Sequence, residues 1–214
     1  MKFKNLMWVG GLLISFCIIG VSFDLISNYT KPANTTLEHL KLIASSMYST
    51  SFLLRIVKII AVAAIGLMSL IIAFNNITDY YSNYPFVMHV LKMDTIFPGS
   101  HMHYRSINNI FLFHAFYIFI IATEAAMAFC CIKGSWLLFK NLKSSAIIFH
   151  ASKSWAIAGI AIGIIIWFLG FEVIGGEWFA MWQSLTWNGL AAAERVLSFL
   201  VLTLILLHLK EEQS

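Results

Sequence analysis

The sequence predicts an all-α integral membrane protein with a four-helix transmembrane core. Of its 214 residues, 60% are apolar and 11% are charged, whereas about 25% of a soluble domain is charged. The apolar residues are also gathered into runs of about 18–25 residues, and each is long enough to cross ~30 Å of hydrocarbon as a helix. Backbone groups must be satisfied internally in lipid, so these continuous runs predict helices rather than strands.

We expect the core helices at residues 52–74, 107–131, 154–171 and 190–209. Another apolar run, 6–23, precedes them, and we expect it to be a retained fifth transmembrane helix. A cleaved signal peptide and a peripheral segment are the alternatives, because lysines precede this run and small residues follow it. The chain is thereby divided into an N-terminal apolar segment and polar loop, 1–50, and the four-helix core, 51–214.

The basic residues predict the orientation of the core. The segment between the second and third core helices and the C-terminus are the lysine-rich parts, with Lys133, Lys140, Lys143, Lys153 and Lys210. The loops on the other side hold Lys92 and Arg105. The positive-inside rule therefore places the C-terminus in the cytoplasm. The formal charge of +4 is spread over helix flanks and does not indicate nucleic-acid binding.

One charged residue is expected deep in the membrane. Glu124 lies in the second core run, and a charge there costs roughly 2.5–3.5 kcal/mol on insertion scales, so it needs a partner. Lys58 and Lys153 lie near the inner ends of neighbouring helices, and an intramembrane ion pair of Glu124 with Lys58, or with Lys153, is the expected arrangement. The alternative is a protonatable site in an ion pathway.

A second polar group is expected near the outer ends of the helices. Its members are charged or titratable side chains that follow or begin apolar runs: Asp79, His114, Glu172, Glu177 and Arg195. Neighbouring polar residues are Asn75, Asn76 and Glu194, and Arg195 would neutralise Glu172 or Glu194. The group is either a hydrogen-bond network at helix ends or a binding site for a small anion, a lipid head group or a quinone.

The outer loops carry local structure. Phe86, Val87, Val90 and Leu91 recur at helical spacing, which predicts a short helix lying on the membrane surface. Pro98-Gly99 predicts a turn.

The stretch 173–190, "VIGGEWFAMWQSLTWNGL", predicts an interfacial element joining the third and fourth core helices. We expect the glycine pair at 175–176 to end the third helix and Asn188 to cap the fourth. Between them, four residues at helical spacing predict one apolar face of a short helix: Trp178, Met181, Trp182 and Leu185. Tryptophan is enriched at the membrane–water boundary.

No catalytic residue, cofactor or metal site is assigned. Bis-histidine haem ligation needs two histidines at equal depth on facing helices. His114 is the only histidine well inside an apolar run, so an integral haem is not expected. His101 and His103 could bind a metal with Asp94, but they lack a third fixed ligand of the usual kind. The three cysteines lie in apolar runs and are expected to be small packing residues.

Three segments resemble a bacterial family of predicted small integral membrane proteins that carry a domain of unknown function. They are "NNITDY" (75–80), "VMHVLKMDTIFPGS" (87–100) and above all "GFEVIGGEWFAMWQSLTWNG" (170–189). The resemblance covers residues 55–210 and implies a four-helix core in the bacterial inner membrane. It implies no activity, substrate or cofactor.

Three functions compete. The first is a non-enzymatic assembly or accessory subunit, which would contact the lipid bilayer and either other membrane subunits or copies of itself. Small residues on the third core helix, Gly159, Ala161 and Gly163, permit close helix contact. The second is a small proton- or ion-coupled transporter or channel that uses Glu124 or the outer polar group. The third is a membrane enzyme acting on a lipid or quinone, with Glu177, Asp79 and His114 as acid/base groups.

Overall fold

The computed structural model describes residues 36–209. The chain divides into two units, Met1–Phe52 and Leu53–Ser214. Of the first unit, the described part is the start of helix α2 (Thr36–Thr78), which continues into the second unit. The helix expected at 6–23 lies outside the described residues.

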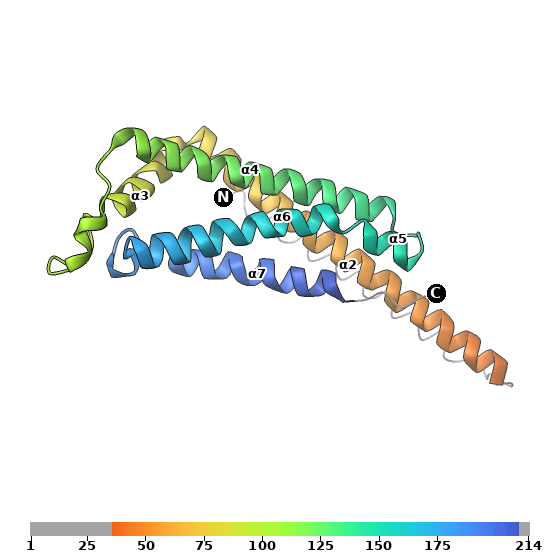
Figure 1. Cartoon of the computed structure of the whole chain (residues 1–214). Coiled ribbons are helices and arrows are strands. Elements are labelled where there is room, and N and C mark those ends of the chain that lie inside the picture. The colour runs from red at the N-terminus through yellow and green to blue at the C-terminus, as the bar shows by residue number, and fades with distance from the viewer. Residues whose placement is uncertain (1–35, 210–214) are drawn as a thin grey trace, which may run out of the picture. The chain divides into compact units, whose positions relative to one another are not determined.

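The second unit contains four helices that are long and apolar enough to cross a membrane, as the sequence predicted. Within the described part these spans are Thr50–Thr78, Ile110–Lys140, Ala146–Trp178 and Leu190–His208. The first belongs to α2, and the second and fourth are α4 (Ile110–Lys140) and α7 (Leu190–His208). The third joins α5 (Ala146–Ala151), α6 (Ser154–Ile164) and η2 (Ile165–Trp178). Figure 1 shows α6 lying between α4 and α7.

The remaining elements connect these spans at the end of the unit where α2 finishes. They are α3 (Tyr80–Lys92), η1 (His101–Arg105) and η3 (Met181–Gln183). We call this the α3 end. Helix α3 is the expected short helix, and a backbone hydrogen bond from Ser100 N to Phe97 O forms the turn expected at Pro98-Gly99.

Helix α4 is longer than predicted, because it ends at Lys140 rather than near residue 131. Gly134, Ser135 and Leu138 in the added part are buried, so packing rather than hydropathy sets the length. At its start, the Asn109 side chain accepts hydrogen bonds from Phe111 N and Leu112 N, which satisfies two exposed donors of the first turn.

The third span is also longer than predicted, and the expected stop at the glycine pair is wrong. From Ile165 the helix takes the wider π form, with i→i+5 hydrogen bonds, and it runs through Gly175 and Gly176 to Trp178. Both glycines are buried, and neither has positive φ. The left-handed residue after this helix is the buried Ala180, at φ 52°. The glycine pair therefore serves packing and not the chain reversal.

Glycines let helices approach closely away from the α3 end. A Cβ added to Gly134 would lie 2.7 Å from Ala156 Cα, and one added to Gly159 would lie 2.9 Å from Cys131 N. Helices α4 and α6 are thus in backbone contact at these positions. The close contact expected at Gly159 is made within the chain, as is that of Gly163 with Met127 and Leu200. Cys130 and Cys131 are buried packing residues, as expected.

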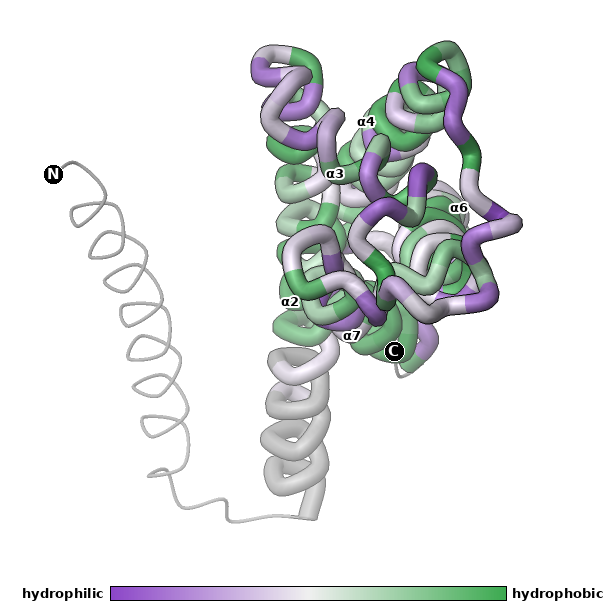
Figure 2. Tube along the Cα trace, turned by 90° about the vertical axis from the view of Figure 1, so that its left-hand side faces the viewer, coloured by the Kyte–Doolittle hydropathy of each residue, from purple (hydrophilic) through white to green (hydrophobic). Residues whose placement is uncertain are grey.

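Two apolar clusters fill the unit. The larger joins all four spans and includes Val62, Met127, Ile160 and Leu200. The smaller, at the α3 end, joins α3 and the first half of α4 to the Phe179-Ala180 segment. Figure 2 shows that hydrophilic residues gather in the connecting loops, while the spans are mainly hydrophobic.

Candidate functional site

Glu124 is the most deeply buried acid among the described residues. Its side chain is 2% exposed, and its Oε2 accepts a 2.8 Å hydrogen bond from Asn76 Nδ2. The Asn76 Oδ1 in turn accepts hydrogen bonds from Tyr117 Oη, at 3.2 Å, and Asn83 Nδ2, at 2.8 Å. Ser69 Oγ donates to the backbone carbonyl of Glu124 at 2.8 Å. These side chains form one polar network between α2, α3 and α4, which we call the Asn76 network.

The expected ion pair of Glu124 with Lys58 is not formed, and neither is the alternative with Lys153. Glu124 was expected about seven residues, roughly 10 Å, from the inner end of a helix that finished at residue 131, but the full length of α4 places it near the middle. There it faces the last turns of α2 rather than the region of Lys58. An amide therefore satisfies the carboxyl group where a cation was expected.

The buried cations instead bind backbone carbonyls at helix ends. Lys58 Nζ donates to Leu209 O at 2.6 Å, and Lys153 Nζ donates to Leu207 O at 2.8 Å, both at the C-terminal end of α7. Arg55 donates to Leu142 O and Ser144 O in the loop after α4. We call these three residues and their acceptors the basic end. Cations are favourable there, because the last carbonyls of a helix carry partial negative charge.

His114 belongs to an aromatic group beside the Asn76 network. Its Nδ1 lies 2.8 Å from Tyr80 Oη, and its ring stacks on Tyr84 with the ring centroids 4.4 Å apart. The rings of Tyr80 and Tyr117 have centroids 4.6 Å apart, which connects this group to the network. Burial, with the neighbouring Tyr84 and Tyr81 as smaller causes, raises the pKa of Tyr80, so the hydroxyl is held in its neutral, hydrogen-bonding form.

Glu172 lies in a different place, in the π helix on the side of α7. Its electrostatic neighbours are Glu194 and Glu177, and its Oε1 is buried with no hydrogen-bond partner among the described residues. Arg195 is exposed. The predicted neutralisation of Glu172 or Glu194 by Arg195 is not seen among the ion pairs of the described part.

The predicted outer polar group therefore separates into two parts. Asp79 is exposed and accepts a 2.6 Å hydrogen bond from Ser82 Oγ, close in sequence to Tyr80 and hence to His114. Glu172 and Glu177 lie on η2. Within residues 36–209, no hydrogen bond, ion pair or ring contact joins one part to the other. The arrangement does not assemble a single acid/base centre from these residues.

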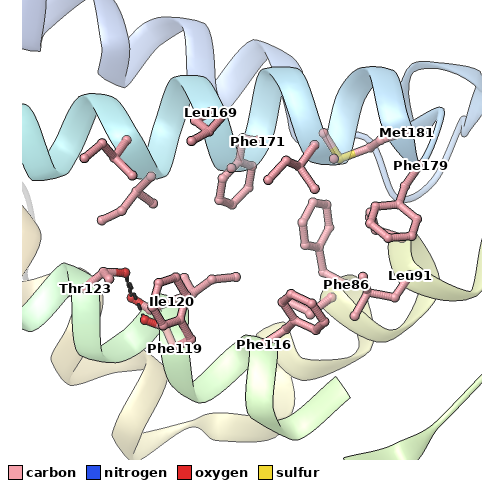
Figure 3. Close-up of a pocket in the computed structure, with 17 residues that line it drawn as sticks. Phe86, Leu91, Phe116, Phe119, Ile120, Thr123, Leu169, Phe171, Phe179 and Met181 are labelled. Atoms are coloured by element: carbon pink, nitrogen blue, oxygen red, sulfur yellow. Dashed lines mark hydrogen bonds between the residues drawn. The ribbon is translucent and has the colours of Figure 1, made fainter. Parts of the chain in front are cut away.

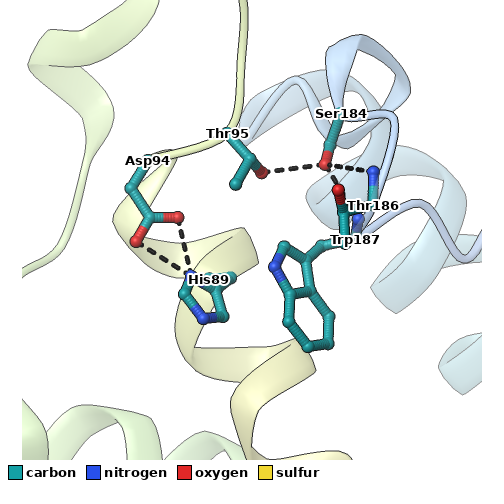
Figure 4. Close-up of polar contacts among 6 residues, drawn as sticks. All are labelled: His89, Asp94, Thr95, Ser184, Thr186 and Trp187. Atoms are coloured by element: carbon teal, nitrogen blue, oxygen red, sulfur yellow. Dashed lines mark hydrogen bonds and ion pairs between the residues drawn. The ribbon is translucent and has the colours of Figure 1, made fainter.

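Polar contacts connect the loops of the α3 end to one another (Figure 4). His89 Nδ1 contacts the Asp94 carboxylate at 2.8 Å, and the His89 ring stacks on Trp187 with the ring centroids 4.7 Å apart. Thr95 Oγ1 lies 2.8 Å from Ser184 Oγ. Asp94 is thus held by His89, rather than facing a metal with His101 and His103.

The tryptophan-rich stretch is not the expected short helix. Trp178 ends the π helix, and only Met181–Gln183 forms a further single turn. Met181 is buried, whereas Trp178 and Trp182 are exposed and Leu185 is 99% exposed. These residues therefore do not share one apolar face. The N-cap of α7 is Gly189 and not the predicted Asn188, but Asn188 Oδ1 accepts a hydrogen bond from Leu190 N at 3.1 Å and so satisfies a donor at the start of the helix.

An apolar cavity of about 290 Å³ lies between α4 and η2 (Figure 3). Its walls come from α3, α4 and η2, with Phe179 and Met181 closing one end. Of the side chains that line it, Thr123 alone is polar, and its hydroxyl donates to Phe119 O and Ile120 O in its own helix. The cavity offers carbon surface and no free hydrogen-bonding side chain.

The chain belongs to a known family, since the model of the family "predicted small integral membrane protein (DUF2165)" matches residues 54–210. The match covers all four spans and the α3 end. The protein is thus an integral membrane protein of a family whose description states no activity. No curated protein and no solved structure matches the chain.

Sequence reasoning missed the Asn76–Glu124 contact and the cavity. Asn76 was assigned to the outer polar group, although an asparagine at the end of an apolar run is also placed to face an acid on the next, antiparallel helix. The run of phenylalanines Phe111, Phe113, Phe116 and Phe119 is a signal for bulky contacts on α4. Nothing in the sequence shows that the opposing helix takes the π form or that its Gly170 lines a space beside α4.

Proposed function

We propose that the protein is a non-enzymatic accessory or assembly subunit of the bacterial inner membrane, which associates with other membrane proteins or with copies of itself. The observation that carries the proposal is the Asn76 network. The one acid near the middle of a described span accepts a hydrogen bond from an amide, and the oxygen of that amide accepts two further hydrogen bonds. An acid committed in this way stabilises the helix packing and is not positioned to act on a substrate.

The surface at the α3 end supports a role in association. Leu185 is 99% exposed, and large apolar side chains beside loops, such as Trp182, Phe97 and Tyr104, are also exposed. Exposed apolar patches of this kind mark protein or membrane contacts. The walls of the spans carry many exposed aliphatic and aromatic side chains as well, which suit lipid or the helices of a partner.

The distribution of cations supports an orientation with the basic end in the cytoplasm. Arg55, Lys58, Lys140, Lys143 and Lys153 all lie at or near that end, whereas the loops of the α3 end carry Lys92 and Arg105. The positive-inside rule then places the α3 end outside. Single cysteines at two exposed positions test this: Gly99→Cys should react with an impermeant maleimide on intact spheroplasts, and Ser145→Cys should react only after lysis. The reverse pattern would overturn the orientation.

Native mass spectrometry of the protein, extracted from its own membranes in mild detergent, tests the accessory role. We expect a second membrane subunit, or a further copy of this chain, at fixed stoichiometry. The Leu185→Asp variant should lose that association while keeping its thermal unfolding temperature. The proposal fails if the wild-type protein is monomeric under conditions that preserve a known membrane complex from the same preparation.

A proton-coupled transporter is a second candidate, favoured by one specific observation. The Tyr80–Tyr117 ring contact connects His114, near the α3 end, to Asn76 and Glu124 near the middle of the span. If protons move along this row, Glu124→Gln should abolish pH-driven uptake in reconstituted vesicles. The accessory role instead requires the Glu124→Gln variant to retain its partner.

A further inference from the structure

The cavity between α4 and η2 is separate from the polar groups discussed above, and it has its own opening. Several of its lining side chains are also exposed on the outside of the unit, including Phe119 at 63% and Ile165 at 56%. Others are buried in the fold, such as Ile166 and Met181. The cavity is therefore continuous with the surface of two transmembrane spans, where the surrounding medium is lipid.

The geometry points to a binding site for one acyl chain of a membrane phospholipid, which enters sideways between α4 and η2. The inference does not depend on the proposed association with other subunits. Its first support is chemical: an almost wholly carbon lining excludes water and polar ligands, and dispersion and hydrophobic contact are the attractions that it offers.

The second support is the length and position of the cavity. Its lining on η2 runs from Ile165 to Gly175, which is roughly 15 Å at the α-helical rise and somewhat less in the wider π form. This is about half of the ~30 Å hydrocarbon thickness, hence about one leaflet. The closed end is at Phe179 and Met181, close to the loops of the α3 end, and the other end is near Thr123 in the middle of α4. A chain of the leaflet on the α3 side has this position and extent.

The third support is the way in which the sequence keeps the space open. A Cβ built on Gly170 would meet only Ile165 O, at 3.7 Å, so that nothing on the facing helix occupies the space beside this residue. Phenylalanines from three elements line the cavity, and among them are Phe86, Phe116 and Phe171. The large rings hold the helices apart while the glycine leaves room beside η2.

A quinone head group is disfavoured as the occupant for a chemical reason. Its carbonyls require hydrogen-bond donors, because an unpaired buried polar group costs free energy. The Thr123 hydroxyl is already donated within its helix, and no other polar side chain lines the cavity. The lining thus matches a hydrocarbon chain better than a ring with polar substituents.

The test uses the full-length protein in vesicles of phosphatidylglycerol and phosphatidylethanolamine, with a trace of phosphatidylglycerol that carries a diazirine within one acyl chain. After irradiation, mass spectrometry of peptides locates the label. We expect labelling of Ile166 and Met181, which line the cavity but are buried from the outer surface. Val62 is buried and does not line the cavity, so it should stay unlabelled.

A variant that fills the cavity makes the test specific. Gly170→Leu should lower labelling at Ile166 and Met181 by about tenfold, the factor equivalent to ~1.4 kcal/mol, and should leave labelling of the exposed Phe74 and Phe199 unchanged. Ala161→Leu adds similar bulk at an exposed position outside the cavity and should change neither. Gly170→Ala adds one methyl group to the same space without a clash. It should lower labelling at Ile166 and Met181 to a smaller extent, and it replaces the leucine variant if that variant does not fold.

Three outcomes would overturn the inference. One is equal labelling of Val62 and Met181, and another is labelling of the cavity that Gly170→Leu and Gly170→Ala leave unchanged. The third is a quinone that co-purifies at one per chain and blocks acyl labelling until it is extracted, because the cavity would then bind a quinone and not a phospholipid chain.

Discussion

The basic end and the α3 end of the four-span unit are built from the same helices but packed in opposite ways. Away from the α3 end, Gly134 and Gly159 let α4 and α6 touch through their backbones. At the α3 end, Phe116 and Phe171 help to line a cavity between α4 and the continuation of α6. Along this one pair of helices, small side chains therefore give close contact at one end, and large side chains accompany a cavity at the other.

The two ends also treat polar groups differently. At the basic end, buried lysines bind backbone carbonyls that the end of α7 leaves unsatisfied. In the Asn76 network, neutral side chains bind each other and one carboxyl group. A cation at a helix end binds a backbone carbonyl that any helix end provides, whereas the Asn76 network needs matched side chains from three helices.

The largest effect should come from closing the tightest contact. Gly134→Leu forces side-chain atoms against the Ala156 backbone, and overpacking a core costs about 1–3 kcal/mol and occasionally more. We expect failure to accumulate, or a thermal unfolding temperature in detergent lower by many degrees. Gly99→Leu is the control, since a Cβ there meets nothing within 4 Å. Equal stability of the two variants would show that α4 and α6 are not in contact.

Removal of a buried cation should have the next largest effect. Lys153→Met leaves the Leu207 carbonyl without its charged donor, and hydrogen bonds to charged groups contribute ~1.5–3 kcal/mol. Lys140→Met, at an exposed position, should change the free energy of unfolding little. Thermal unfolding followed by tryptophan fluorescence compares the pair, and a larger loss in Lys140→Met would contradict the basic end as described.

The Asn76 network should show coupling between its members. Glu124→Leu leaves a buried amide donor unsatisfied, at a cost of about 1–3 kcal/mol, whereas adding Asn76→Leu removes the unsatisfied group as well. We therefore expect the double variant to be more stable than the sum of the two single losses implies. Strict additivity in this double-mutant cycle would mean that the two side chains are not in contact.

The smallest effect is expected at Tyr80. Tyr80→Phe removes the hydrogen bond to His114, at a cost of about 0.5–1.5 kcal/mol. The pKa of Tyr80 is raised in the fold, so its contribution to stability is complete below its unfolded pKa of about 10 and declines as the pH rises towards the folded value. The stability difference between the wild type and Tyr80→Phe should therefore shrink above pH ~10. A difference that grew with pH would show that the pKa of Tyr80 is not raised in the fold.

The transmembrane core could be predicted because hydrocarbon imposes one simple requirement on length and composition. The ends of the helices could not, because they depend on partners. Helix α4 continues past Lys133 since Gly134 and Leu138 have surfaces to pack against, and η2 continues past its glycine pair for the same reason. Hydropathy reports how strongly a side chain prefers an apolar phase to water, and it contains no information on contacts between helices.

The candidate site was predicted less well for a related reason. The correct partner of Glu124 depends on its depth, and its depth depends on where α4 ends. An error of nine residues at that end moved the expected partner from Asn76 to Lys58. The cavity depends in addition on the π form of η2, which no hydrophobic period specifies.

The position of the lysine acceptors has a consequence for biosynthesis. Lys58 binds a carbonyl 151 residues later in the chain, and Lys153 binds one 54 residues later. Both lysines precede α7 in the chain, so neither can reach these acceptors while the first three spans are entering the membrane. The last helix therefore supplies backbone acceptors for cations that were inserted before it.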